Sequence, residues 1–90
     1  MIAKNKNEVL KQLRILSKLS VEALAEATGL SQGYINRLEA GEVENLSYIY
    51  GKYAKALRIQ EGKIRRMAER AEKENWSASQ IVAEVRSLVE

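Results

Sequence analysis

Four positions, Gln32, Gly33, Asn36 and Arg37, have the spacing that gathers side chains on one face of a helix. Glutamine and asparagine amides can pair bidentately with adenine, and an arginine guanidinium can pair in the same way with guanine. Gly33 keeps this face slim, so a backbone could approach a base edge closely. The residue types and their spacing therefore indicate hydrogen-bonding recognition of bases in duplex DNA.

Two short helices and a tight turn are predicted to position this face. Ser20 and Ser31 are favoured N-cap residues, and Gly29 between them supplies the left-handed backbone that ends the first helix. Ile35 and Leu38 lie opposite the polar face, so we expect them to anchor the second helix to the core. This is the layout of a helix-turn-helix.

The remaining residues also predict helices. The chain has no proline, and no useful length alternates with period two, so we expect an all-α fold. Tyr50 and Tyr53 are expected in the core and Tyr48 at the surface. The expected helices cover about 7–17, 21–28, 32–40, a stretch from 45 or 47 to 58, 61–74, and a last stretch from 77 onward.

Composition narrows the function classes. The 90 residues include no His, Cys or Asp, which removes most metal ligands, acid–base groups and nucleophiles. We expect no enzyme activity, no metal and no cofactor, although catalysis by Glu, Lys, Ser or Tyr alone stays open. Neither a signal peptide nor a membrane span is recognisable, so the expected location is the cytoplasm and no membrane partner is expected.

Charge is unevenly distributed along the chain. Residues 1–20 hold five basic residues and one acid, residues 21–47 hold one basic residue and five acids, and residues 48–76 hold eight basic residues and four acids. Basic segments therefore flank an acidic helix pair. Such flanks are suited to contacts with phosphates, although the 61–74 run also fits a solvated helix surface.

From Leu10 to Ile59 the sequence resembles the lambda-repressor-like (Cro/C1, or XRE) helix-turn-helix regulators. The fourth expected helix is similar to the final packing helix of that family through Ala54-Lys55-Ala56-Leu57. The other matching segments are Leu13-Arg14, Leu19-Ser20, Leu24-Ala25-Glu26, Thr28-Gly29-Leu30-Ser31, Tyr34-Ile35, Arg37-Leu38-Glu39 and Gly41.

The resemblance implies a compact five-helix lambda-repressor-like domain, here with an extra C-terminal helix, which binds double-stranded DNA as a homodimer. Its base-reading positions fall on Gln32, Gly33, Asn36 and Arg37 here. The resemblance also implies a structural ion pair between Arg14 and Glu39. The candidate phosphate contacts are Arg14, Lys18, Ser20, Val21, Ser31, Tyr34 and Ser47.

Three departures from the family pattern stand out. Val21 replaces a glutamine that often contacts phosphate, so only its backbone could serve. The loop after the second helix of the motif carries the acids Glu42 and Glu44 where the family often has basic residues. Residues 60–90 extend past the matching segment. The expected organisation is thus a basic arm over 1–6, the DNA-binding domain over 7–60 and C-terminal helices over 61–90.

The C-terminal helices have two possible roles. They could complete the core of the monomer, or their apolar face could form the dimer interface that a palindromic site requires. We expect the second role, through Trp76, Ile81, Val82, Val85, Leu88 and Val89. The expected function is a dimeric transcriptional repressor. The alternative is an antitoxin or adaptor that holds a protein partner with these helices.

Overall fold

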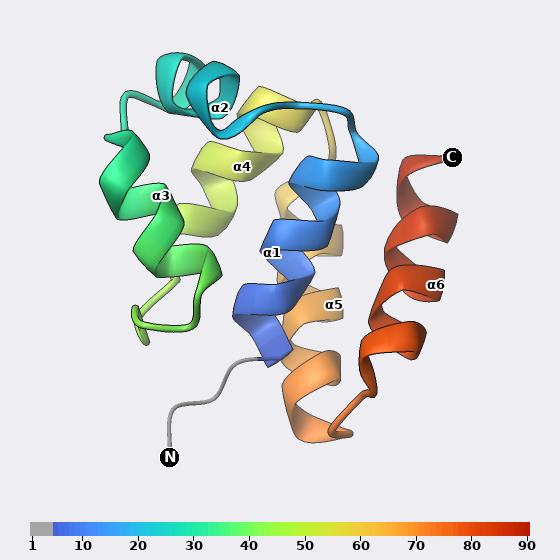
Figure 1. Ribbon diagram of the computed structural model, residues 1–90. Helices are drawn as coiled ribbons and strands as arrows, with labels where there is room; N and C mark the ends of the chain where they lie inside the picture. The colour runs from blue at the N-terminus through green and yellow to red at the C-terminus, as the bar shows by residue number, and fades with distance from the viewer. Residues whose placement is uncertain (1–4) are drawn as a thin grey trace.

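The computed structural model describes residues 5–90, which form six helices and no strand (Figure 1). The all-α prediction is therefore confirmed. The helices are α1 (Asn5–Leu16), α2 (Val21–Thr28), α3 (Gln32–Glu39), α4 (Ile49–Leu57), α5 (Glu61–Lys73) and α6 (Ala78–Val89).

Serine caps start three of these helices, including the two predicted at Ser20 and Ser31. The Oγ atoms of Ser20, Ser31 and Ser77 accept hydrogen bonds from the backbone N–H groups three residues later, at 3.0, 3.1 and 3.2 Å. Each bond satisfies a donor that the first helical turn leaves unpaired. Gly29 ends α2 with φ +78°, in the left-handed region that favours glycine. Local sequence thus defines the helix-turn-helix boundaries.

Three other helices are followed by a residue that has a left-handed backbone but is not glycine. Lys18 after α1 and Arg58 after α4 both have φ +61°, and Asn75 after α5 has φ +52°. Asparagine tolerates this region, whereas lysine and arginine pay a steric penalty between Cβ and the following carbonyl. These two turns are therefore held by packing on either side rather than by their own residue preferences.

The first helix begins earlier than expected. Asn5 and Lys6 belong to α1, two residues before the expected start at 7, and residues 1–4 of the predicted arm lie outside the described part. The reason is tertiary contact with the end of α5. The amide of Asn5 donates to the carbonyl of Ala71 at 2.9 Å, and the Lys6 ammonium lies 3.7 Å from the Glu72 carboxylate.

Helix α1 runs through the middle of the fold, with α3 on one side and α5 and α6 on the other (Figure 1). Its apolar stripe, Val9, Leu10 and Leu13, is fully buried. Because α6 packs against α1, it covers apolar surface that α1 would otherwise expose to water. No helix within residues 5–90 is long and apolar enough to cross a membrane.

This packing changes the expected role of α6. Trp76, Ile81 and Val85 are only 4%, 2% and 0% exposed, within the chain's own core. Most of the surface of these three side chains is therefore used within one copy, and their assignment to a dimer interface stays a prediction. Val82, Leu88 and Val89 are half-buried and remain reachable. The C-terminal helices therefore complete the monomer's core first.

Candidate nucleic-acid interface

The polar face of α3 is free, and its opposite face is anchored. Ile35 and Leu38 have no exposed surface, as expected for the anchoring side. The predicted base-reading positions share the solvent side of the helix, and all four are exposed: Gln32, Gly33, Asn36 and Arg37. The helix therefore presents amide and guanidinium donors on a rigid, slim surface, which is the chemistry that pairs with base edges in a major groove.

The end of α3 is held by an ion pair that crosses the fold. The Arg14 Nε lies 3.0 Å from both carboxylate oxygens of Glu39, and its Nη2 donates to Oε1 at 2.9 Å. The hydroxyl of Tyr53 donates to the other oxygen of Glu39 at 2.8 Å. Three helices thus meet at one carboxylate, whose side chain is 5% exposed. The predicted structural pairing of Arg14 with Glu39 is confirmed.

Most donors of Arg14 are engaged within the fold. Its remaining Nη1 donates to the backbone carbonyl of Leu19 at 2.9 Å, and the side chain is 13% exposed. The phosphate contact through Arg14 stays a prediction. Its guanidinium fixes α1, the following turn and α3 together. Burial, and then the negative charge of Glu39, raise the pKa of the Tyr53 hydroxyl well above its usual range.

A buried asparagine secures the loop that follows α3. The amide of Asn7, with no exposed surface, donates to the carbonyls of Leu38 at 2.8 Å and Val43 at 2.9 Å. Carbonyls at a helix end lack intrahelical partners, so this side chain satisfies a group that burial would otherwise penalise. The sequence analysis did not identify Asn7, because nothing near it in the chain predicts contacts more than 30 residues away.

Two tyrosines form an exposed corner beside α3. The hydroxyl oxygens of Tyr34 and Tyr48 lie 3.4 Å apart, and the Arg37 guanidinium carbon is 5.8 Å from the centre of the Tyr34 ring. The hydrogen bond with Tyr48, more than burial, raises the pKa of Tyr34. Tyr48 is 58% exposed, as expected, but was missing from the predicted contacts. The corner offers hydroxyls and a cation next to the base-reading face.

Three other predicted phosphate contacts lie at helix N-termini. Ser20 and Ser31 are exposed and act as caps through their oxygen lone pairs, which leaves each hydroxyl hydrogen available to an anion. Val21 is half-buried, and only its backbone N–H at the start of α2 can serve. Lys18 is exposed in the turn before α2. These groups offer donors in the turn before α2 and at the starts of α2 and α3.

Ser47, a predicted phosphate contact, donates its hydrogen bonds within the loop before α4. Its backbone N–H and its hydroxyl both donate to the side-chain oxygen of Asn45, at 3.1 and 2.8 Å. Helix α4 begins later, at Ile49 with Tyr48 as its N-cap residue, because the loop closes on itself first. The donors of Ser47 are therefore engaged within the loop rather than offered at a helix start.

One basic cluster was missed by the sequence analysis. Lys52, Lys55 and Arg58 are exposed on and after α4 and line a hollow with Ala27 and Thr28 at the end of α2. Their spacing of three residues is a signal that could have placed them on one helix face. They add three positive charges next to the turn that leads into α3, where duplex phosphates would be attracted.

Similarity to known proteins identifies the family of the chain. Within residues 5–90 no group of His, Cys, Asp and Glu could hold a metal ion. Neither a search of curated proteins nor one of solved structures gives a match. Residues 10–64 match the helix-turn-helix family model HTH_3, which covers more than half of the chain. The chain therefore belongs to the HTH_3 helix-turn-helix family of Cro/C1-type DNA-binding regulators.

Proposed function

We propose that the chain is a sequence-specific repressor that binds a two-fold symmetric operator in double-stranded DNA as a dimer. The observation that carries this proposal is the exposed face of α3, held from behind by Ile35, Leu38 and the Glu39 ion pair. A recognition helix must keep its orientation to distinguish bases, because each bidentate contact depends on geometry. A dimer bound over a promoter would then block access of RNA polymerase and so repress transcription.

Affinity comes from cations around that face. The acidic residues Glu42 and Glu44 in the loop after α3 are exposed and repel a nearby phosphate. Lys18 and the α4 cluster of Lys52, Lys55 and Arg58 supply compensating positive charge. Such contacts release counterions, so we expect binding to weaken steeply as salt concentration rises.

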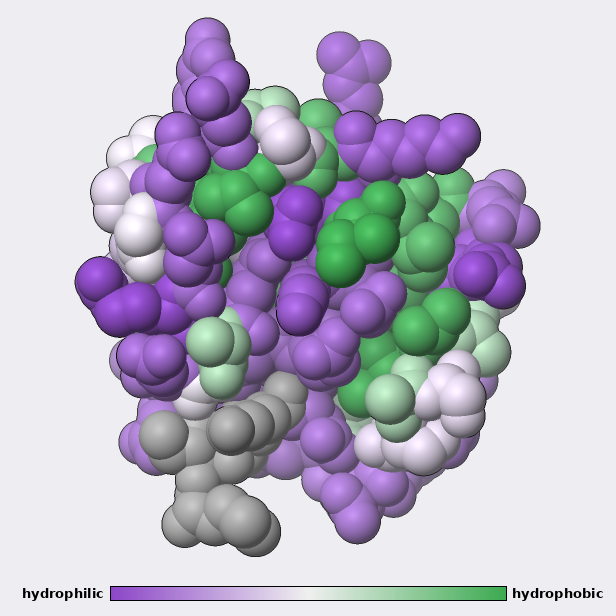
Figure 2. All heavy atoms as spheres, in the orientation of Figure 1, coloured by the Kyte–Doolittle hydropathy of each residue, from purple (hydrophilic) through white to green (hydrophobic). Residues whose placement is uncertain are grey.

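Dimerisation uses the part of α6 that the core leaves available. Val82 and Val89 are half-buried, and Ile15 on α1 is 41% exposed. Figure 2 shows apolar side chains gathered over the side of the molecule where α1 and α6 lie. We assign the contact with a second copy to these three residues. On a two-fold symmetric site, successive major grooves would require the two α3 helices to lie about 34 Å apart.

The test is a selection of binding sites from a random duplex library, followed by binding measurements on the selected site. Asn36→Ala and Arg37→Ala should each weaken binding about 10-fold or more and relax preference at one base pair. Arg86→Ala removes a cation from α6 and serves as the matched control, with unchanged preference. If both α3 variants select the same site with unchanged affinity, base reading by this face is wrong.

Dimerisation has its own test. Val82→Glu should shift the chain toward monomer in sedimentation and weaken binding to the full site more than to a half-site. A wild-type chain that stays monomeric with and without DNA at micromolar concentration would contradict the dimer. The alternative of an antitoxin or adaptor predicts weak duplex binding without sequence preference, so the same library selection would return no site.

A further inference from the structure

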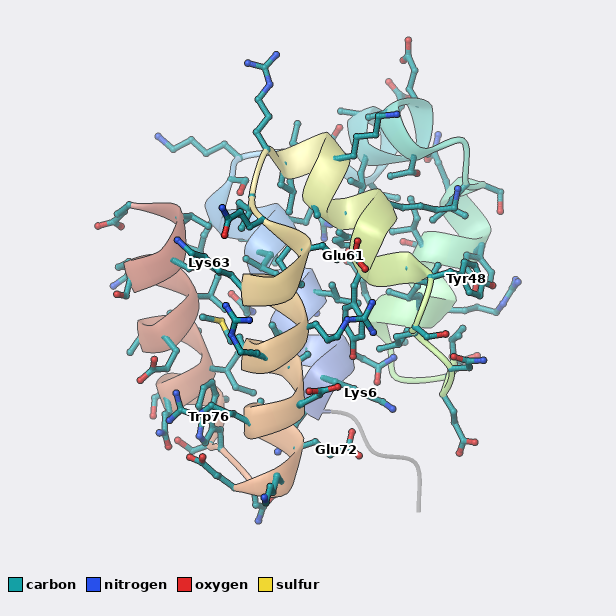
Figure 3. All side chains as sticks on the ribbon, turned by 180° about the vertical axis from the view of Figure 1, so that it is seen from behind. Lys6, Tyr48, Glu61, Lys63, Glu72 and Trp76 are labelled. Atoms are coloured by element: carbon teal, nitrogen blue, oxygen red, sulfur yellow. The ribbon has the colours of Figure 1, made fainter. Side chains whose placement is uncertain are left out.

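A groove of about 270 Å³ runs between α5 and α6, away from the polar face of α3. Its apolar lining comes from Met67, Trp76 and Leu88, and its basic side from Lys63, Arg66 and Arg70. In Figure 3, Lys63 and Trp76 lie on the α6 side of α5, near its two ends. The base-reading residues lie across α1 from this groove, so a ligand here would not cover them.

The acidic residues of α5 lie on the side away from the groove, where the cations Arg65 and Lys73 accompany them. Glu69 and Glu72 face the hollow near Lys6, and Glu61 and Glu72 lie on the same side in Figure 3. The cations Lys63 and Arg66 face the groove instead, and neither has an ion-pair partner within residues 5–90. Uncompensated positive charge is thus concentrated along one edge of an apolar groove.

The Trp76 end of the groove is held in place by contacts within the chain. The Arg70 guanidinium lies 5.2 Å from the centre of the Trp76 ring and is 3.1 Å from the Glu74 carboxylate. The indole N–H of Trp76 donates to the same carboxylate at 3.0 Å. Hydrogen bonds from Trp76 and Arg70 lower the pKa of Glu74. The aromatic wall therefore has a fixed position before any partner arrives, which reduces the entropy cost of binding.

A second copy of the chain is a poor occupant of this groove. A two-fold contact across it would bring Lys63, Arg66 and Arg70 of one copy against the same cations of the other, and like charges repel. Glu84 is the groove's one acidic lining residue, so the lining keeps a net positive charge. The occupant that complements both the apolar floor and this edge carries apolar side chains next to carboxylates.

We propose that the α5–α6 groove binds an acidic amphipathic helix of a partner protein. Apolar side chains at i, i+3 or i+4 and i+7 of that helix would enter between Met67, Trp76 and Leu88. Flanking glutamates or aspartates would pair with Lys63 and Arg66, which span about one turn of α5. The chain could then hold a protein partner and duplex DNA at the same time, on opposite sides of α1.

A synthetic peptide tests the proposal on the full chain. The probe is a helix of about 15 to 20 residues with leucines at the spacing above and glutamates beside them. Trp76 is the only tryptophan of the chain, so its fluorescence reports occupancy directly. We expect saturable binding, together with amide shifts confined to α5 and α6. Equal binding of a peptide with lysines in place of the glutamates would overturn the charge argument.

Charge-reversed variants separate the groove from general electrostatics. Lys63→Glu combined with Arg66→Glu should weaken peptide binding about 10-fold or more, because two attractions become repulsions. Lys52→Glu combined with Lys55→Glu changes net charge equally on α4 and should leave peptide binding unchanged. Both groove positions are at the surface, so the folded chain is retained. Equal losses in the two double variants would refute a specific site.

Two further measurements distinguish other occupants. Random-sequence duplex DNA should not displace the peptide, and displacement would assign the groove to nucleic acid instead. Sedimentation of the Lys63→Glu, Arg66→Glu variant should match the wild type, and a loss of dimer would assign the groove to a second copy. DNA binding by α3 is measured separately in each variant. A groove that binds no peptide would therefore not contradict the proposed repressor function.

Discussion

The guanidinium of Arg14 binds the carboxylate of Glu39 through three nitrogen–oxygen contacts of 2.9 to 3.0 Å. This ion pair joins the end of α1 to the end of α3. Tyr53 on α4 donates to the same carboxylate. Because both side chains of the pair are largely buried, each charge depends on the other for compensation. The orientation of the recognition helix is therefore tied to a contact far from its polar face.

Removing one partner of this pair should unfold the protein more easily. Arg14→Ala leaves the Glu39 carboxylate buried without its cation, and we expect a loss of about 3 to 5 kcal/mol in the free energy of unfolding. Denaturant titration followed by circular dichroism measures it. The control is Arg86→Ala, which breaks the exposed pair with Glu90 and should cost less than about 1 kcal/mol. Similar losses in both variants would contradict a supporting role for Arg14.

Stability should fall in alkaline solution. Burial raises the pKa of Tyr50 to about 12 and raises that of Tyr53 further above its ordinary value, which is about 10 in an unfolded chain. Above about pH 10 the unfolded chain loses protons that the folded chain keeps, so the free energy of unfolding decreases as pH rises. The stabilisation is complete below this range and, for Tyr50, is lost by about pH 12.

The measurement is denaturant unfolding between about pH 8 and pH 11.5, with a decrease of at most about 1.4 kcal/mol per pH unit for each tyrosine. Tyr53→Phe should lower stability at pH 8, since the Glu39 carboxylate loses a donor, and should flatten the alkaline decrease. An alkaline decrease that is as steep in Tyr53→Phe and Tyr50→Phe as in the wild type would exclude these hydroxyls as its source.

Capping and phosphate binding by Ser31 can be separated with two substitutions. Ser31→Ala removes the bond to the Tyr34 N–H and should cost about 1 kcal/mol of stability. Ser31→Asp keeps a capping oxygen but adds a negative charge, so we expect stability to be retained and duplex binding to weaken. Ser77→Asp makes the same change at the start of α6. If Ser77→Asp weakens duplex binding equally, Ser31 has no special place at the interface.

Replacing a left-handed residue at a helix end by glycine should relieve its steric strain. Arg58→Gly removes a Cβ from a residue with φ +61° and should add about 0.5 to 1 kcal/mol to the free energy of unfolding. Asn75→Gly should gain less, because asparagine already tolerates φ +52°. Gly29→Ala makes the opposite change at φ +78° and should destabilise. Thermal unfolding of the three variants checks the order, and a loss of stability in Arg58→Gly would show that this turn is unstrained.

Local signals in the sequence were enough for the motif itself. Ser20, Ser31 and Gly29 act on backbone groups within three or four residues, so their identity defines where α2 ends and α3 begins. The polar face of α3 follows from helical periodicity alone. The pairing of Arg14 with Glu39 came from the family resemblance, which supplied a contact between residues 25 positions apart.

Tertiary packing decided the remaining features. Whether Trp76, Ile81 and Val85 face a second copy or the chain's own core depends on where α6 lies, and an apolar stripe predicts burial without naming its partner. The same holds for Asn7, whose two acceptors are distant in the chain, and for Ser47, whose donors are taken by Asn45. Sequence determined the helices and the recognition face, because those depend on neighbouring residues. Structure decided which surfaces remain free, because burial is a property of the whole fold.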